Sequence, residues 1–243
     1  MKRNSAGTMP VVTTLFWGIL ALVLRRQLYL TGVDARNLLV QNHPLSIAVT
    51  VLTIGILIRT VLLVRKREDN RCYEKLYGGR LPGALGNLAA GAGILLTVLT
   101  AAPVAAGYLQ AAWYWLGLAA PVCMLLAAIV RMLGKKPLFL LHVVACLFFV
   151  LHIVTRYQLW SSLPQMQDYL FSMLGAMALM FFGFYTAALE ADCGNVPMMW
   201  GMGLAAVYFC TAELARSSCP WMYLGGIVWV LLDVCGMSQM EKE

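Results

Sequence analysis

The sequence predicts an all-α fold, a polytopic transmembrane helix bundle that forms one integral membrane domain over residues 1–243. Hydrophobic residues make up 61% of the chain and charged residues 12%, whereas charged residues usually make up about a quarter of a soluble domain. A soluble domain of this size needs more polar surface, and a disordered chain needs lower hydrophobicity and more charge. Apolar runs also recur at lengths near the roughly 20 residues that a helix needs to cross a bilayer.

About eight runs qualify as spans, in the order 9–24, 44–64, 84–106, 111–130, 138–154, 169–189, 197–214 and 221–235. The first reaches residue 30 if Arg25 and Arg26 extend their charged ends to the interface, and seven spans remain if this run does not cross. The second opens at Pro44, where a missing backbone N–H costs little. Only a few residues around 107–110 join the third and fourth runs, which predicts a tight antiparallel hairpin.

The later spans carry similar boundary signals. Pro121 lies inside the fourth run and predicts a kink there. Pro137, Pro197 and Pro220 stand at the start of the fifth, seventh and eighth runs, again at positions where proline is tolerated. The sixth run is rich in methionine and aromatic residues, and the eighth is short and contains Asp233.

The third span is rich in small residues. Gly86 and Ala90, and likewise Ala89 and Gly93, are spaced four residues apart, which places each pair on one helix face and allows close helix packing. The pattern predicts that this helix packs at the centre of the bundle. The alternative is that it forms a thin wall of a substrate path.

The loops differ in basic charge from one side of the membrane to the other. With eight spans both termini lie on one side, which holds 12 Lys and Arg residues against 5 on the other. Because cytoplasmic loops carry the basic excess, the richer side is predicted to be cytoplasmic. It includes the basic loop 65–82. Arg25 and Arg26 argue locally against an outward first loop, but the dense second loop outweighs them.

Five ionisable residues are predicted to lie near the outer ends of the fifth to seventh spans. We call them the outer cluster: His152, Arg156, Asp168, Glu213 and Arg216. Ionisable groups at membrane depth pair with one another, line water or serve a pathway. The cluster is therefore a candidate binding site, and the alternative is interfacial charges with structural ion pairs. Because an unpaired charge is costly there, Glu213 is predicted to pair with Arg156 or Arg216.

A second polar group is predicted at the cytoplasmic ends. Glu190, Asp192 and Asp233 fall at the ends of the sixth and eighth spans. Their expected partners, Arg131, Lys135 and Lys136, follow the fourth span, so a structural network at the rim is favoured. Asp233 most needs a partner, because it lies deepest in the apolar region.

Motifs for other chemistry are missing from the sequence. It contains no zinc-protease, nucleophile-elbow or phosphate-loop motif, so an enzyme is disfavoured, although an intramembrane enzyme stays open. The cysteines form no CxxC pair and indicate neither a metal site nor a disulfide framework. No cofactor is implied. Nucleic-acid binding is not expected, because basic runs interleaved with aromatic residues do not occur.

Two stretches carry a resemblance, QLYLTGVDARNLLVQNHP and RYQLWSSLPQMQDYLFSMLGAMALMFFGFYTAALEADCGN. With the alternation of short spans, they resemble uncharacterised multi-span membrane proteins of bacteria. The resemblance covers about half the chain and implies a bacterial cell membrane, with both termini cytoplasmic from the charge count. It implies no activity and no site residues.

These observations leave two leading functions. The first is a small-solute transporter or substrate-capturing membrane subunit, with the outer cluster as its solute site. The second is a non-transporting sensor or assembly partner that binds another protein. The expected partners are therefore the lipid bilayer and either a small solute or a protein.

Overall fold

The computed structural model describes residues 8–32, 43–66, 80–100, 107–160 and 169–240, and these residues form eight α-helices and no strand. The helices are α1 (Thr8–Thr31), α2 (Pro44–Arg65), α4 (Arg80–Thr100), α5 (Tyr108–Met132), α6 (Leu140–Trp160), α7 (Leu170–Glu190), α8 (Val196–Glu213) and α9 (Pro220–Met240). Each corresponds to one of the predicted spans, which confirms the all-α helix bundle. Most of the predicted basic loop, residues 67–79, lies outside the described residues.

Prolines stand in the first turns of α2, α8 and α9, as the sequence predicts, whereas α6 begins at Leu140, three residues after Pro137. Asn195 accepts a hydrogen bond from the backbone N–H of Met198 at 2.9 Å, and Pro197 stands in the first turn of α8. In α2, His43 Nδ1 accepts from the backbone N–H of Leu45 at 3.3 Å. These caps satisfy donors that the first turn of a helix leaves without partners.

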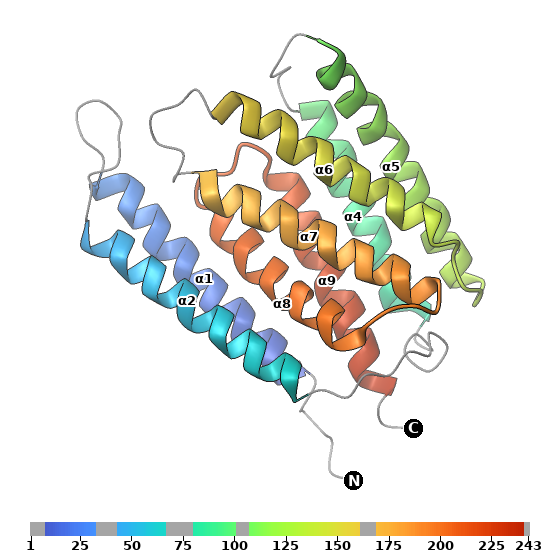
Figure 1. Ribbon diagram of the computed structural model, residues 1–243, viewed down its shortest axis with the longest axis horizontal. Coiled ribbons are helices and arrows are strands. Elements are labelled where there is room, and N and C mark those ends of the chain that lie inside the picture. Colours follow the sequence, from blue (N-terminus) through green and yellow to red (C-terminus); the bar gives the residue numbers. More distant parts are fainter. Residues whose placement is uncertain (1–7, 33–42, 67–79, 101–106, 161–168, 241–243) are drawn as a thin grey trace.

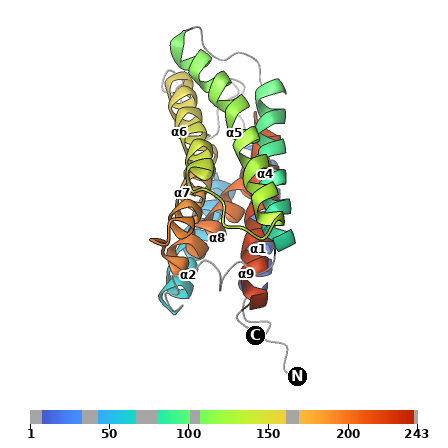
Figure 2. The same ribbon diagram turned by 90° about the vertical axis from the view of Figure 1, so that its right-hand side faces the viewer.

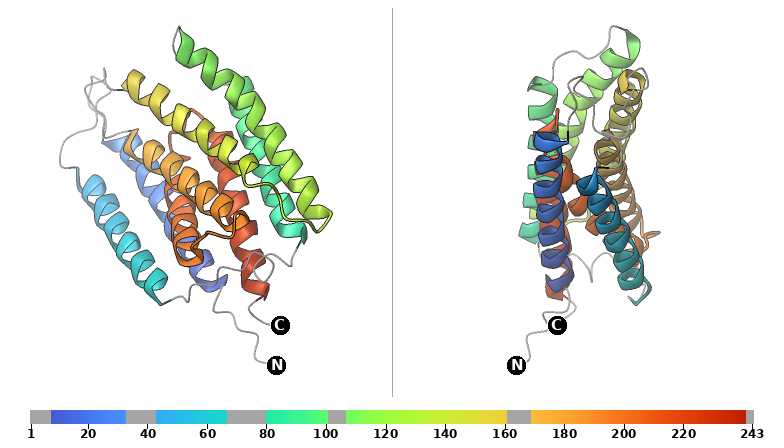
Figure 3. Two further views of the ribbon diagram at one scale, coloured as in Figure 1. Left: turned by 45° about the vertical axis from the view of Figure 1, so that its right-hand side comes forward. Right: turned by 90° about the vertical axis from the view of Figure 1, so that its left-hand side faces the viewer.

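The helices pack in two layers with α8 between them. Seen edge-on, α1, α9 and α4 lie on one side and α2, α7 and α6 on the other (Figures 2 and 3). The order across the broad face runs from α1 and α2 at one edge to α4 and α5 at the other (Figure 1). In α8, 15 of 18 residues are buried, against three of 22 in α2. The centre of the bundle is therefore α8, and α2 is peripheral.

The outer faces of the helices are apolar, as contact with lipid requires. Exposed side chains of α2 include Ile47, Val51, Ile54, Ile58 and Val61. Six helices (α1, α2, α4, α5, α6 and α7) are long and apolar enough to cross a membrane. Of the remaining two, the apolar stretch described in α9 is shorter, at Pro220–Val234. The chain is a helical membrane protein.

The small residues of α4 lie against α9, and the two backbones come very close. A Cβ on Gly93 would lie 2.6 Å from the Trp221 carbonyl oxygen, and one on Gly225 would lie 2.6 Å from the Ala89 carbonyl oxygen. A Cβ on Gly86 would likewise lie 3.1 Å from the Trp229 carbonyl oxygen. The close packing predicted for the third span is thus confirmed, because α4 packs most extensively on α9 and α5. Its predicted position at the centre of the bundle is wrong, because α8 occupies the centre and α4 lies at one edge (Figure 1).

Candidate functional site

The largest set of buried charges lies where five helices meet, and we call it the inner network. Its members come from α4, α5, α6, α7 and α9: Asn87, Arg131, His142, Glu190 and Asp233. Arg131 donates from Nη1 to Asp233 Oδ1 at 3.0 Å and from Nη2 to Glu190 Oε1 at 3.2 Å. His142 Nδ1 lies 2.8 Å from Glu190 Oε2, and its Nε2 lies 3.4 Å from Asn87 Oδ1. One guanidinium therefore joins two carboxylates, and one imidazole joins a carboxylate to an amide.

The structure confirms Arg131 as the predicted partner of the acidic residues, but it places this network deeper than predicted. Arg131 pairs with both Glu190 and Asp233, as predicted, and Lys136 pairs with Asp192. The expected rim location is wrong for the first set, because the side chains of Arg131, Glu190 and Asp233 are at most 3% exposed. Of these three pairs, the Lys136–Asp192 pair lies at the surface.

His142 and Asn87 are the members that the sequence reasoning missed. His142 is fully buried and stacks on Trp229, with ring centroids 6.1 Å apart. Asn87 is fully buried in α4. A signal was present: Asn87 is a strongly polar residue in the first half of its apolar helix, and His142 lies in the first turn of its own. Depth alone, however, does not show which helix faces meet.

At the opposite end of the bundle, Glu213 pairs with a cation that was not expected. Arg25 Nη1 donates to Glu213 Oε2 at 3.0 Å and to the Ala212 carbonyl at 2.8 Å. The predicted pairing of Glu213 with Arg156 or Arg216 is therefore wrong: the ion pair joins α8 to α1, not to α6 or to its own end. Arg25 was counted as a loop charge, yet it lies within α1 and is 3% exposed.

Aromatic rings complete the environment of this pair. The Arg25 guanidinium lies over the Phe171 ring at 4.3 Å and over the Tyr29 ring at 5.7 Å. Arg216 lies over the same Tyr29 ring at 4.9 Å. Cations above aromatic faces are attracted by the ring quadrupole. The shared Tyr29 ring thus links Arg216 to the Arg25–Glu213 pair, although Arg216 itself is exposed.

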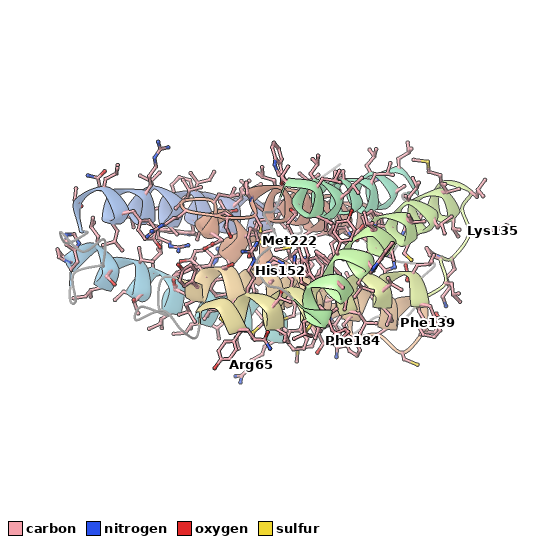
Figure 4. All side chains as sticks on the ribbon, turned by 90° about the horizontal axis from the view of Figure 1, so that it is seen from above. Arg65, Lys135, Phe139, His152, Phe184 and Met222 are labelled. Carbon is pink, nitrogen blue, oxygen red and sulfur yellow. The ribbon has the colours of Figure 1, made fainter. Side chains whose placement is uncertain are left out.

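His152 and Arg156 of α6 form a separate group with Trp113 of α5 and with Cys219, the residue before α9. Trp113 Nε1 donates to His152 Nδ1 at 3.3 Å, and Arg156 Nη2 donates to the Cys219 sulfur at 2.9 Å. His152 lies inside the bundle, as does Met222 of α9, whereas Arg65 and Phe184 lie at its periphery (Figure 4). Because indole N–H only donates, His152 Nδ1 carries no proton.

The structure therefore divides the outer cluster. Glu213 and Arg216 belong with Arg25 and Tyr29 at α1 and α8, and His152 and Arg156 belong with Trp113 and Cys219. Asp168 lies outside the described residues.

Mutating both partners of the Arg25–Glu213 pair should give strongly non-additive losses of stability. Arg25→Gln or Glu213→Gln alone leaves one buried charge uncompensated, whereas the double variant leaves none. Unfolding in mixed detergent micelles should yield a coupling energy above about 0.5 kcal/mol. The matched cycle of Arg156→Gln with Glu213→Gln should be additive. Strong coupling in that second cycle, with none in the first, would contradict the pairing.

The described residues contain no group of three or more His, Cys, Asp or Glu side chains placed to hold a metal ion. Comparison of the chain with protein-family models, with curated proteins and with solved structures finds no match. The candidate sites are therefore the three buried polar groups: the inner network, the Arg25–Glu213 pair and the His152–Arg156 group.

Proposed function

We propose that this membrane protein binds a small anionic solute beside Arg156, as a transporter or as a substrate-capturing membrane subunit. The observation that carries the proposal is the environment of Arg156. This cation is 7% exposed, and among the described residues its hydrogen-bond partner is the Cys219 sulfur. Buried arginines ordinarily pair with a carboxylate, because an isolated charge is costly to remove from water.

The described ionisable groups around Arg156 do not supply that carboxylate. Glu213 is engaged by Arg25. His152 is one helical turn from Arg156, and its Nδ1 accepts a hydrogen bond from Trp113, so its ring is neutral. The Arg156 charge is thus not balanced by the described side chains around it. A buried guanidinium bonded to a sulfur, with no carboxylate among its described partners, favours a carboxylate or phosphate group.

We also propose that the protein lies in a bacterial cell membrane with both termini in the cytoplasm. The Lys and Arg excess supports cytoplasmic termini, and the resemblance supports a bacterial cell membrane. With this orientation, Arg156 lies at the outer end of α6, where a solute from outside arrives first. The burial of Arg25 and Arg156 strengthens the charge argument, because neither acts as a free loop charge.

Anions should stabilise the wild-type protein and fail to stabilise an Arg156→Gln variant. Thermal unfolding of the detergent-purified chain would be followed with inorganic phosphate, sulfate, acetate and succinate. A ligand present at 100 times its Kd stabilises the folded state by about 2.7 kcal/mol. We expect at least one of the four to raise the unfolding temperature of the wild type by the corresponding amount.

Arg26→Gln is the matched control, because Arg26 is an exposed arginine of α1. This variant should retain the full anion response, whereas Arg156→Gln loses it. If no anion stabilises the wild type, or if both variants respond alike, the solute site is wrong. The second hypothesis, a sensor or assembly partner without a solute site, would then be favoured.

A further inference from the structure

His142 lies between two hydrogen-bond acceptors. Its Nδ1 faces a carboxylate oxygen of Glu190 at 2.8 Å, and its Nε2 faces the amide oxygen of Asn87 at 3.4 Å. A neutral imidazole has one N–H donor and one acceptor nitrogen, whereas an imidazolium has two donors. Only the imidazolium donates to both of these partners.

The charge balance of the inner network also favours a protonated His142. Among its described members, Arg131 contributes one positive charge and Glu190 and Asp233 contribute two negative charges. Asp233 Oδ2 is buried and has no hydrogen-bond partner among the described residues. A neutral His142 would therefore leave one excess negative charge in a region closed to water, which is costly. A proton on His142 brings the sum to zero, as a proton on Asp233 Oδ2 also would, and the two acceptors that face the imidazole place it on His142.

We propose that the inner network is a proton-binding site, with the bound proton on His142. The site lies at the end of the bundle opposite to Arg156 and does not depend on the proposed anion site. Histidines and carboxylates within membrane spans are the groups that relay protons in pumps and transporters. The ligand of this second site is thus the proton itself.

Asn87 allows the network to accommodate both protonation states. Its Nδ2 is buried without a partner among the described residues, while its Oδ1 faces His142. A half-turn of the amide exchanges these two atoms and presents an N–H to a neutral Nε2. His142 then keeps its donor bond to Glu190. Loss of the proton therefore requires the rotation of one side-chain amide and no helix movement.

The groups that face His142 come from every helix around it. They are Asn87 from α4, Arg131 from α5, Glu190 from α7 and Asp233 with Trp229 from α9. Within α6 itself, the other histidine is His152, ten residues further on and bonded to Trp113. His142 is thus the described imidazole on which the charge balance of this network depends.

Nitrogen NMR of the full-length chain, with ¹⁵N-labelled histidine, tests the assignment directly. The chain has three histidines, and the single variants His43→Gln, His142→Gln and His152→Gln assign their signals. At pH 7, both His142 nitrogens should carry protons, whereas His152 Nδ1 should not. A neutral His142 at pH 7 would overturn the proposal, and His152 serves as the buried control in the same helix.

Stability provides a second measurement that isolates the charge. In His142→Gln, the side-chain amide can still donate to Glu190, but the positive charge is lost. We expect His142→Gln to lower the unfolding temperature and the addition of Glu190→Gln to restore most of that loss, because the double variant is again neutral. If Glu190→Gln instead adds to the loss, the network does not hold the proton on His142.

Discussion

Replacing Arg131 by methionine should destabilise the protein by about 3–5 kcal/mol, the cost expected when one partner of a buried ion pair is removed. The effect should lie at the upper end of this range, because Arg131 bonds both Glu190 and Asp233. Equilibrium unfolding in mixed detergent micelles, followed by circular dichroism, measures the loss.

Lys136→Met is the matched control for this result. Lys136 also pairs with an acidic residue at the same end of the bundle, but its side chain is 33% exposed and that of Asp192 is 65% exposed. Exposed pairs contribute about 0–1 kcal/mol. Adding Glu190→Gln and Asp233→Asn to Arg131→Met should recover much of the stability, because these changes remove the orphaned charges. Equal losses in the Arg131 and Lys136 variants would contradict the central position of Arg131.

Substituting Gly225 by alanine should destabilise the protein by about 1–3 kcal/mol, the usual cost of overpacking. The added methyl group would meet the Ala89 carbonyl oxygen at 2.6 Å and the Gly93 Cα at 3.0 Å. Both obstacles are backbone atoms, so α4 and α9 must separate to admit it. The same unfolding measurement applies.

Gly55→Ala provides the opposite expectation. Nothing lies within 4 Å of a Cβ at Gly55, in the middle of peripheral α2. Alanine is favoured over glycine inside a helix by up to about 1 kcal/mol, so this variant should be neutral or slightly more stable. A similar loss in both variants would show that helix packing between α4 and α9 is not the cause.

The helices were predictable because each needs a long apolar run. Such a run can be read directly from the sequence, without knowing how the helices pack. The structure differs from the prediction at polar residues near the ends of the apolar runs. The sequence predicts the first span at 9–24 with an extension to residue 30, and α1 continues to Thr31. Arg25 was treated as an interfacial charge, because its partner Glu213 is 188 residues away in the sequence.

The polar groups were predictable in depth but only partly in pairing. Arg131, Glu190 and Asp233 all fall near the same ends of their spans, and the structure joins them. Position along a helix does not determine how each helix is rotated about its axis. That rotation brings His142 to Glu190, and it brings Arg25 rather than Arg156 to Glu213. Only tertiary packing fixes it.

The burial of α8 has a consequence for how the chain is inserted during synthesis. This helix is enclosed by its neighbours and ends at Glu213, so the burial of that carboxylate depends on a cation from another helix. We infer that α8 enters alongside α7, against which it packs extensively, and that Arg25 of the earlier α1 is already in place to receive Glu213. The order of synthesis then supplies partners for the polar residue before it must leave water.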